Sequence, residues 1–299
     1  MMNVTVGIFF LFLLICVGIG VISALIGISG GMLLIPALLF LFRFSMVDAI
    51  FMSLIGMAGL TISAALSYMK GRFVNYNLAA VYSILDYPGV ILGGILASFL
   101  FENALAGLCG LIMIMLGIKL FRTRNKHKSV EISGEILESR DTKDEKNPSM
   151  AEKETMETNG GGKDKQYKYE KLGVDNLKVV AFSSFSGGVI AGMLGLGGGT
   201  IETSSMLLAG VDPKTAAGTS ELSMSFTATF AVGFHLFLGN FNGVFIWPFL
   251  TCMGTVIGAQ FGGLICKRIK GHSVQTLFSV IVVYAGILML LMVFDIGWI

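Results

Sequence analysis

Charged residues are crowded into a single stretch of this chain. Residues 122–176 hold 24 of the 40 charged side chains, whereas the other 244 residues hold 16. The charged share of the whole sequence is 13%, about half of what a soluble domain carries, and the hydrophobic share is 54%. Most residues outside this stretch must therefore face lipid or protein, and the sequence predicts an integral, multi-pass membrane protein.

Apolar runs long enough to cross a bilayer lie on both sides of the charged stretch. A hydrocarbon core of about 30 Å needs roughly 20 apolar residues in a helix. The expected spanning helices are Val6–Ile26, Val47–Met69, Leu78–Phe101, Leu105–Phe121, Leu177–Leu194, Thr215–Leu238, Val244–Ile265 and Val274–Phe294. Two further runs, Met32–Phe42 and Ile201–Leu208, are too short to span and each follows a glycine cluster. We predict a broken or re-entrant helix at each.

The two sides of the chain match each other without gaps at an offset of 168 residues. The glycine cluster of the first side falls on that of the second, and Gly71-x-Phe73 falls on Gly239-x-Phe241. The chain therefore reads as an internal duplication. It divides into a first membrane repeat (residues 1–121), a charged linker (122–176) and a second membrane repeat (177–299).

Positive charges suggest that the two repeats are inverted. The turn with Lys70 and Arg72 is basic and the next turn carries Glu102, whereas the equivalent turns are uncharged at Gly239 and basic at Lys267. Because basic loops favour the cytoplasmic side, equivalent loops are expected on opposite sides. The predicted fold class is an all-α polytopic membrane protein. It consists of two inverted repeats, each with about four full transmembrane helices and one short broken or re-entrant segment.

The linker contains too few apolar residues to form a core, so we expect it to be disordered. It follows Arg122 and Arg124, which places it in the cytoplasm. Both a plain solvated connector and a segment that binds a cytoplasmic partner are open readings.

The glycine clusters are the first candidate site. A short helix that restarts after such a break presents free N–H groups and the positive end of its dipole, which can hold an anion. Tight helix packing is the alternative role for the glycines. The candidate substrate contacts in and beside the clusters are Gly27, Ser29, Gly30, Gly31, Gly195, Gly197, Gly198, Gly199 and Thr200.

Hydroxyl groups supply further candidates. Thr219 and Ser220 could donate to anion oxygens, or bond to carbonyls of their own helix. Ser53 is the hydroxyl of the equivalent stretch in the first repeat, where it stands in the place of Glu221.

Ionisable residues are rare at membrane depth and often functional there. Glu202, Glu221, His235 and Asp86 are such residues here, and the first three are the candidates for proton coupling. Glu202 lies three residues after the second glycine cluster, close to any central site. His235 can also be read as a boundary histidine. Asp86 precedes Tyr87-Pro88 and is interpreted as a cap at a helix kink.

Several other classes of function lack a signal in the sequence. The net charge of +2 suggests no nucleic-acid partner. The cysteines have no metal-ligand spacing, no catalytic motif is present, and the glycine clusters have no βαβ context. We expect neither a metal, nor a cofactor, nor an enzymatic activity; the expected partners are lipid, a small anion and protons.

The motifs also resemble a known family. Gly27-Ile-Ser-Gly-Gly-Met-Leu-Leu-Ile-Pro36, and Gly195-Leu-Gly-Gly-Gly-Thr200 running on to Ala217-Gly-Thr-Ser220, are similar to the TauE/SafE family of sulfite and organosulfonate exporters. The likeness covers both repeats, and the charged linker is similar to that of eukaryotic members. It implies transport of sulfur-containing anions such as sulfite, thiosulfate or sulfonates, with the glycine motifs near the substrate path.

Departures from the family pattern are concentrated in the motifs. Glu202 occupies an apolar family position, Ser204 stands where the first block has Pro36, and Ser29 replaces a motif glycine. These differences suggest a substrate other than sulfite and halves that no longer contribute equally. The sequence thus favours a secondary transporter of small anions, with proton coupling as a further feature. The alternatives are an anion channel, and a receptor or adaptor that acts through the linker.

Overall fold

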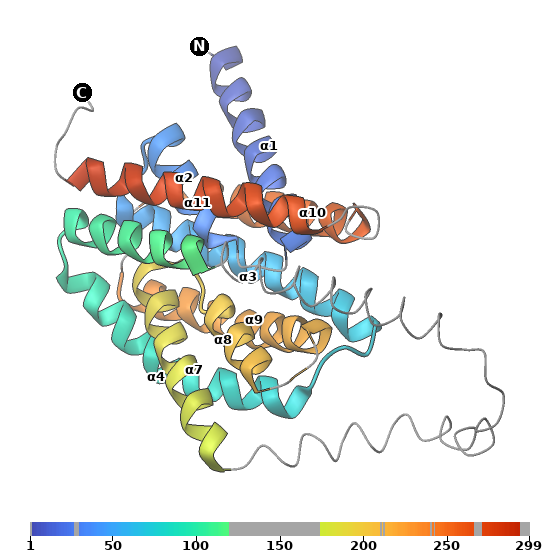
Figure 1. The fold of residues 1–299 in the computed structure, drawn as a ribbon. Coiled ribbons are helices and arrows are strands. Elements are labelled where there is room, and N and C mark those ends of the chain that lie inside the picture. Colours follow the sequence, from blue (N-terminus) through green and yellow to red (C-terminus); the bar gives the residue numbers. More distant parts are fainter. Residues whose placement is uncertain are drawn as a thin grey trace, which may run out of the picture.

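The computed structural model describes residues 2–26, 30–119, 174–209, 211, 213–239, 241, 243–265 and 271–293, and within these ranges the chain is α-helical (Figure 1). Four of the described helical segments are long and apolar enough to cross a membrane: Gly7–Ala24, Met46–Lys70, Tyr76–Phe99 and Glu102–Lys119. The prediction of a polytopic helical membrane protein is confirmed.

Each expected apolar run forms a helix. The first repeat contains α1 (Met2–Ile26), α2 (Gly31–Phe42), α3 (Met46–Lys70), α4 (Tyr76–Phe99) and a helix over Glu102–Lys119. The second contains α7 (Val174–Leu194), α8 (Gly199–Leu208), α9 (Pro213–Phe237), α10 (Ile246–Ile265) and α11 (Gly271–Val293). The predicted linker lies outside the described residues up to 173, and α7 begins within its last residues.

The two short helices turn back along the helices that precede them. Gly198 packs against the backbone of Gly187, and Ser183 Oγ donates to Ser205 Oγ at 3.1 Å, so α8 runs back along α7. In the first repeat, the rings of Phe12 in α1 and Phe42 at the end of α2 meet edge to face, with centroids 4.8 Å apart. The chain therefore reverses direction after α1 and after α7.

Glycines let the long helices approach backbone to backbone. A side chain at Gly89 or Gly93 of α4 would collide with carbonyl oxygens of α7, and one at Gly192 of α7 would collide with Val90 of α4. Gly20 of α1 and Gly258 of α10 allow the same approach in the other large helix pair. Van der Waals contact of this kind replaces the hydrophobic effect, which gives little attraction between helices in lipid. Tight packing is thus a real role for many of the glycines.

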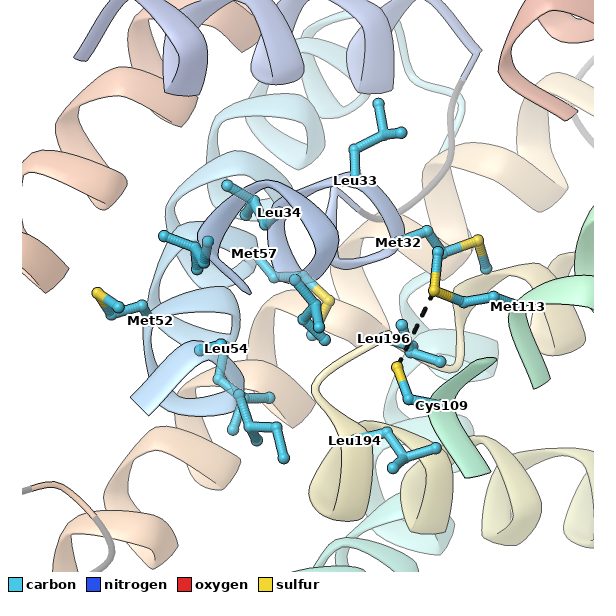
Figure 2. Packing of buried hydrophobic residues seen from close by; sticks show 14 of the residues in the cluster. Met32, Leu33, Leu34, Met52, Leu54, Met57, Cys109, Met113, Leu194 and Leu196 are labelled. Carbon is cyan, nitrogen blue, oxygen red and sulfur yellow. Dashed lines mark hydrogen bonds between the residues drawn. The ribbon is translucent and has the colours of Figure 1, made fainter. Parts of the chain in front are cut away.

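The main hydrophobic core surrounds the loop after α7. Leu194 and Leu196, on either side of Gly195, are fully buried, as are Met32 of α2 and Met113 of the Glu102–Lys119 helix. Figure 2 shows these side chains around the break. Elements that are far apart in the sequence therefore converge where the two short helices begin.

Candidate functional site

The two glycine clusters meet in the structure. Gly31 begins α2, and a side chain there would collide with the carbonyl oxygen of Gly195 and lie 3.0 Å from Ser53 Oγ. Ser53 Oγ of α3 donates to this same carbonyl at 2.8 Å. The sequence grouped Gly31, Gly195 and Ser53 in one site, and the structure brings them together. Gly27 and Ser29 lie outside the described residues.

Backbone geometry explains the glycines of the second cluster. Gly195 and Gly197 have φ values of +64° and +81°, a region that residues with a Cβ rarely adopt. Gly198 lies directly on the backbone of Gly187, which leaves no room for a side chain. The cluster is therefore what lets the chain reverse before Gly199 and start α8 beside α7.

The start of α8 combines two features that suit an anion. Its first turn offers backbone N–H groups at the positive end of the helix dipole. Thr200 in this turn is only 9% exposed, and its Oγ1 has no hydrogen-bond partner in the part of the chain that the structure describes. A buried hydroxyl without a partner is destabilising, so its presence needs an explanation. A ligand that accepts from this hydroxyl would supply one.

The hydroxyls of α9 have different roles. Ser220 Oγ lies 3.2 Å from the carbonyl oxygen of Gly199 and 3.3 Å from Glu202 Oε2, and can donate to either. Thr219 Oγ1 accepts from the backbone N–H of Asn75 at 3.0 Å, which ties the start of α4 to α9. Ser220 thus belongs to the glycine site, whereas the observed contact of Thr219 supports the fold.

Glu202 is fully buried, and its carboxyl group interacts directly with that of Asp86 in α4. Thr227 Oγ1 of α9 donates to Asp86 Oδ2 at 2.7 Å. The other oxygens, Asp86 Oδ1 and Glu202 Oε1, receive no hydrogen bond from any described residue. A carboxyl pair therefore lies where α4, α8 and α9 meet, one helical turn from Gly199.

Asp86 is the residue whose role the sequence missed. It stands two residues before Pro88, inside a continuous α4 rather than at its end, and its side chain is fully buried. Its contacts with Glu202 and Thr227 replace the expected kink cap. An acidic residue in the middle of an apolar run was the available signal, but its partners lie more than 100 residues away.

Glu221 and His235 lie apart from this pair. Glu221 is buried and its Oε2 has no partner among the described residues, but adjacent positions on a helix face different directions, so it does not share the face of Ser220. The ring Nε2 of His235 lies 2.7 Å from the carbonyl oxygen of Gly192 in α7. Fifteen residues separate it from Ser220, roughly 20 Å along α9.

Further hydroxyls join the same helices. The Tyr82 hydroxyl of α4 lies 2.6 Å from Ser205 Oγ of α8. Ser83 Oγ of α4 lies 3.3 Å from Ser223 Oγ of α9. These contacts flank the carboxyl pair and hold α4, α8 and α9 in register around it.

The chain is similar to a known protein family and to several membrane proteins. A family model described as "Sulfite exporter TauE/SafE" matches residues 12–289. A "Probable membrane transporter protein YunE" of Bacillus subtilis (strain 168) is 22% identical over 278 residues, which cover 89% of this chain and 92% of that protein.

Two shorter matches involve other organisms. "Sulfite exporter TauE/SafE family protein 5" of Arabidopsis thaliana is 27% identical over 115 residues, 35% of this chain and 26% of that protein. A "Probable membrane transporter protein" of Xylella fastidiosa (strain Temecula1 / ATCC 700964) is 33% identical over 101 residues, 33% of this chain and 39% of that protein. No solved structure matches the chain.

Because the two breaks pack against each other, the adjacent residues Gly30 and Gly31 should differ in how well they tolerate an added methyl group. In Gly31→Ala the methyl group would have to displace the carbonyl of Gly195, whereas in Gly30→Ala it meets the end of Leu60 at 3.2 Å, which can move. Overpacking of this kind is destabilising by about 1–3 kcal/mol. We therefore expect a clearly lower melting temperature for Gly31→Ala than for Gly30→Ala, measured on purified protein in detergent. Equal melting temperatures would show that the breaks do not pack as described.

Proposed function

This chain belongs to the sulfite exporter TauE/SafE family, and we propose on that premise that it carries small anions across the membrane as a secondary transporter. The family and the relatives are membrane transporters, so the chain is an integral multi-pass transporter and not an enzyme. The proposed substrates are sulfur-containing oxyanions such as sulfite, thiosulfate or sulfonates. The names of the family and of the Arabidopsis relative support this class.

The proposed binding site is the start of α8, opposite the start of α2. The observation that carries this proposal is the buried hydroxyl of Thr200, which has no hydrogen-bond partner among the described residues and lies next to the N–H groups of the first turn of α8. Both kinds of donor suit the oxygens of a small anion, and neither brings a full positive charge. A site that lacks a fixed cation can release its substrate, as transport requires.

We also propose that the two membrane halves act as inverted repeats around this site. At the offset of 168 residues the ends of α1 and α7 coincide, and so do the starts of α2 and α8. The two most extensive helix pairs, α1 with α10 and α4 with α7, exchange with each other under the same offset. Such pseudo-symmetry around broken helices is a common plan of secondary transporters, in which one half rocks against the other.

Uptake into proteoliposomes tests the proposed function. Radiolabelled sulfite, thiosulfate and sulfate would be offered to the reconstituted protein with and without an imposed pH gradient. We expect saturable uptake of at least one sulfur anion, with accumulation that follows the gradient. Uptake that rises linearly with concentration and ignores the gradient would favour an anion channel. If no anion enters above the level of empty liposomes, the receptor or adaptor reading replaces the transporter.

Thr200→Val separates a ligand contact from a structural one. Because Thr200 Oγ1 bonds to no described residue, its removal should leave the melting temperature unchanged or higher. Loss of a hydrogen bond to a charged ligand, worth about 1.5–3 kcal/mol, should raise the half-saturating anion concentration by tenfold or more. Thr61→Val is the matched control, since Thr61 Oγ1 donates to Met57 of its own helix at 2.8 Å. Unchanged uptake by Thr200→Val would remove this residue from the site.

A further inference from the structure

The structure contains a buried carboxyl pair that the family match does not explain. Asp86 and Glu202 come from different membrane halves, both are fully buried, and their carboxyl groups interact directly. The pair is therefore a product of the fold, built where α8 turns back between α4 and α9.

We propose that Asp86 and Glu202 act as one proton-binding unit, which keeps one proton between the two carboxyl groups and takes up a second proton together with the anion. This inference deepens the proposed function and rests on it for the coupling step. The shared proton itself is a property of the pair and is testable without transport.

The hydrogen-bond pattern supports a shared proton. Each carboxyl group has one oxygen with a hydroxyl donor, Thr227 for Asp86 and Ser220 for Glu202, and one oxygen without any donor in the described part of the chain. Two ionised carboxylates in contact would repel strongly when buried. A single proton shared between the two carboxyl groups would remove this repulsion.

The groups described around the pair are hydroxyls. From α4 the pair faces the hydroxyl of Tyr82, which both carboxyl groups influence. From α9 it faces the hydroxyls of Ser220, Ser223 and Thr227. None of the contacts described for the pair involves a lysine, an arginine or a histidine. A proton between the two carboxyl groups can supply the compensating positive charge.

The opposite repeat shows that the fold does not need this pair. At the offset of 168 residues, Leu34 takes the place of Glu202, Gly254 that of Asp86, and Gly59 that of Thr227. These positions are closely packed: Leu34 touches Gly56, and Gly254 touches Cys16. The junction around α2 thus has no acid at the equivalent positions, whereas the junction around α8 buries two. A purely structural role does not explain this asymmetry.

Ser220 links the pair to the proposed anion site. Its hydroxyl lies within hydrogen-bonding distance of both Gly199 O at the start of α8 and Glu202 Oε2. With one proton the pair carries a net charge of −1, which opposes an anion beside Thr200. A second proton brings the pair to neutrality and removes this repulsion. One proton would then enter with each anion and leave the pair when the anion is released on the other side.

Amide variants test the coupling. Asp86→Asn and Glu202→Gln keep the shape of each side chain, and each amide can donate to the remaining carboxylate. A gradient of one pH unit can drive about tenfold accumulation when one proton moves with each anion. We expect about this ratio for the wild type. The double variant Asp86→Asn/Glu202→Gln is neutral without any proton, so we expect no gradient-driven accumulation there, with exchange of labelled for unlabelled anion retained. Asp48→Asn at the start of α3 and Glu102→Gln at an exposed helix start are matched controls that should accumulate as the wild type does.

Infrared spectroscopy of the purified, lipid-reconstituted protein tests the shared proton independently. At neutral pH the wild type should show a protonated-carboxyl C=O band that both amide variants lose and both controls keep. A band unchanged in the single variants would overturn the proposal, and so would gradient-driven accumulation that survives in the double variant. If the wild type carries none of the tested anions, the proposed function fails, while the infrared band still decides whether the pair holds a proton.

Discussion

A helix that breaks at membrane depth leaves backbone groups that water cannot reach, and this chain has two such breaks. In the structure the two breaks pack against each other. The carbonyl of Gly195 accepts from Ser53 of the opposite half, and Gly31 at the start of α2 lies on that same carbonyl. Because this contact admits no side chain, it sets where α2 and α8 begin. The polar groups of the candidate site follow from that placement.

The second consequence is an unequal division of polar groups between the halves. Once α8 turns back along α7, Glu202 lies against α4 and α9, where it contacts Asp86 and Ser220, and Thr227 donates to Asp86. The equivalent turn of α2 places Leu34 beside Gly56. Both turns serve the fold, but one of them has acquired acids and hydroxyls beside the start of a short helix. Anion binding and proton binding are thus proposed at the same junction around α8, joined by the hydroxyl of Ser220.

The helices and the breaks could be predicted from the sequence, because apolar runs of membrane length and glycine clusters are local signals. The repeat offset also anticipated which helix ends correspond, since Ile26 and Leu194 end α1 and α7. Contacts between residues that are far apart in the sequence could not be predicted. Thr219 was expected to face an anion or its own helix, yet it binds the backbone of Asn75. Asp86 was interpreted as a cap, because nothing local indicates that a residue more than 100 positions away folds back beside it.

The most direct measurement is an experimental structure of the protein in lipid with a saturating concentration of the sulfur anion that it transports. The account predicts density for the anion at the start of α8, within hydrogen-bonding distance of Thr200 Oγ1 and the N–H groups of the first turn. Density elsewhere, with the start of α8 closed by protein alone, would contradict a site at the meeting of the two glycine breaks.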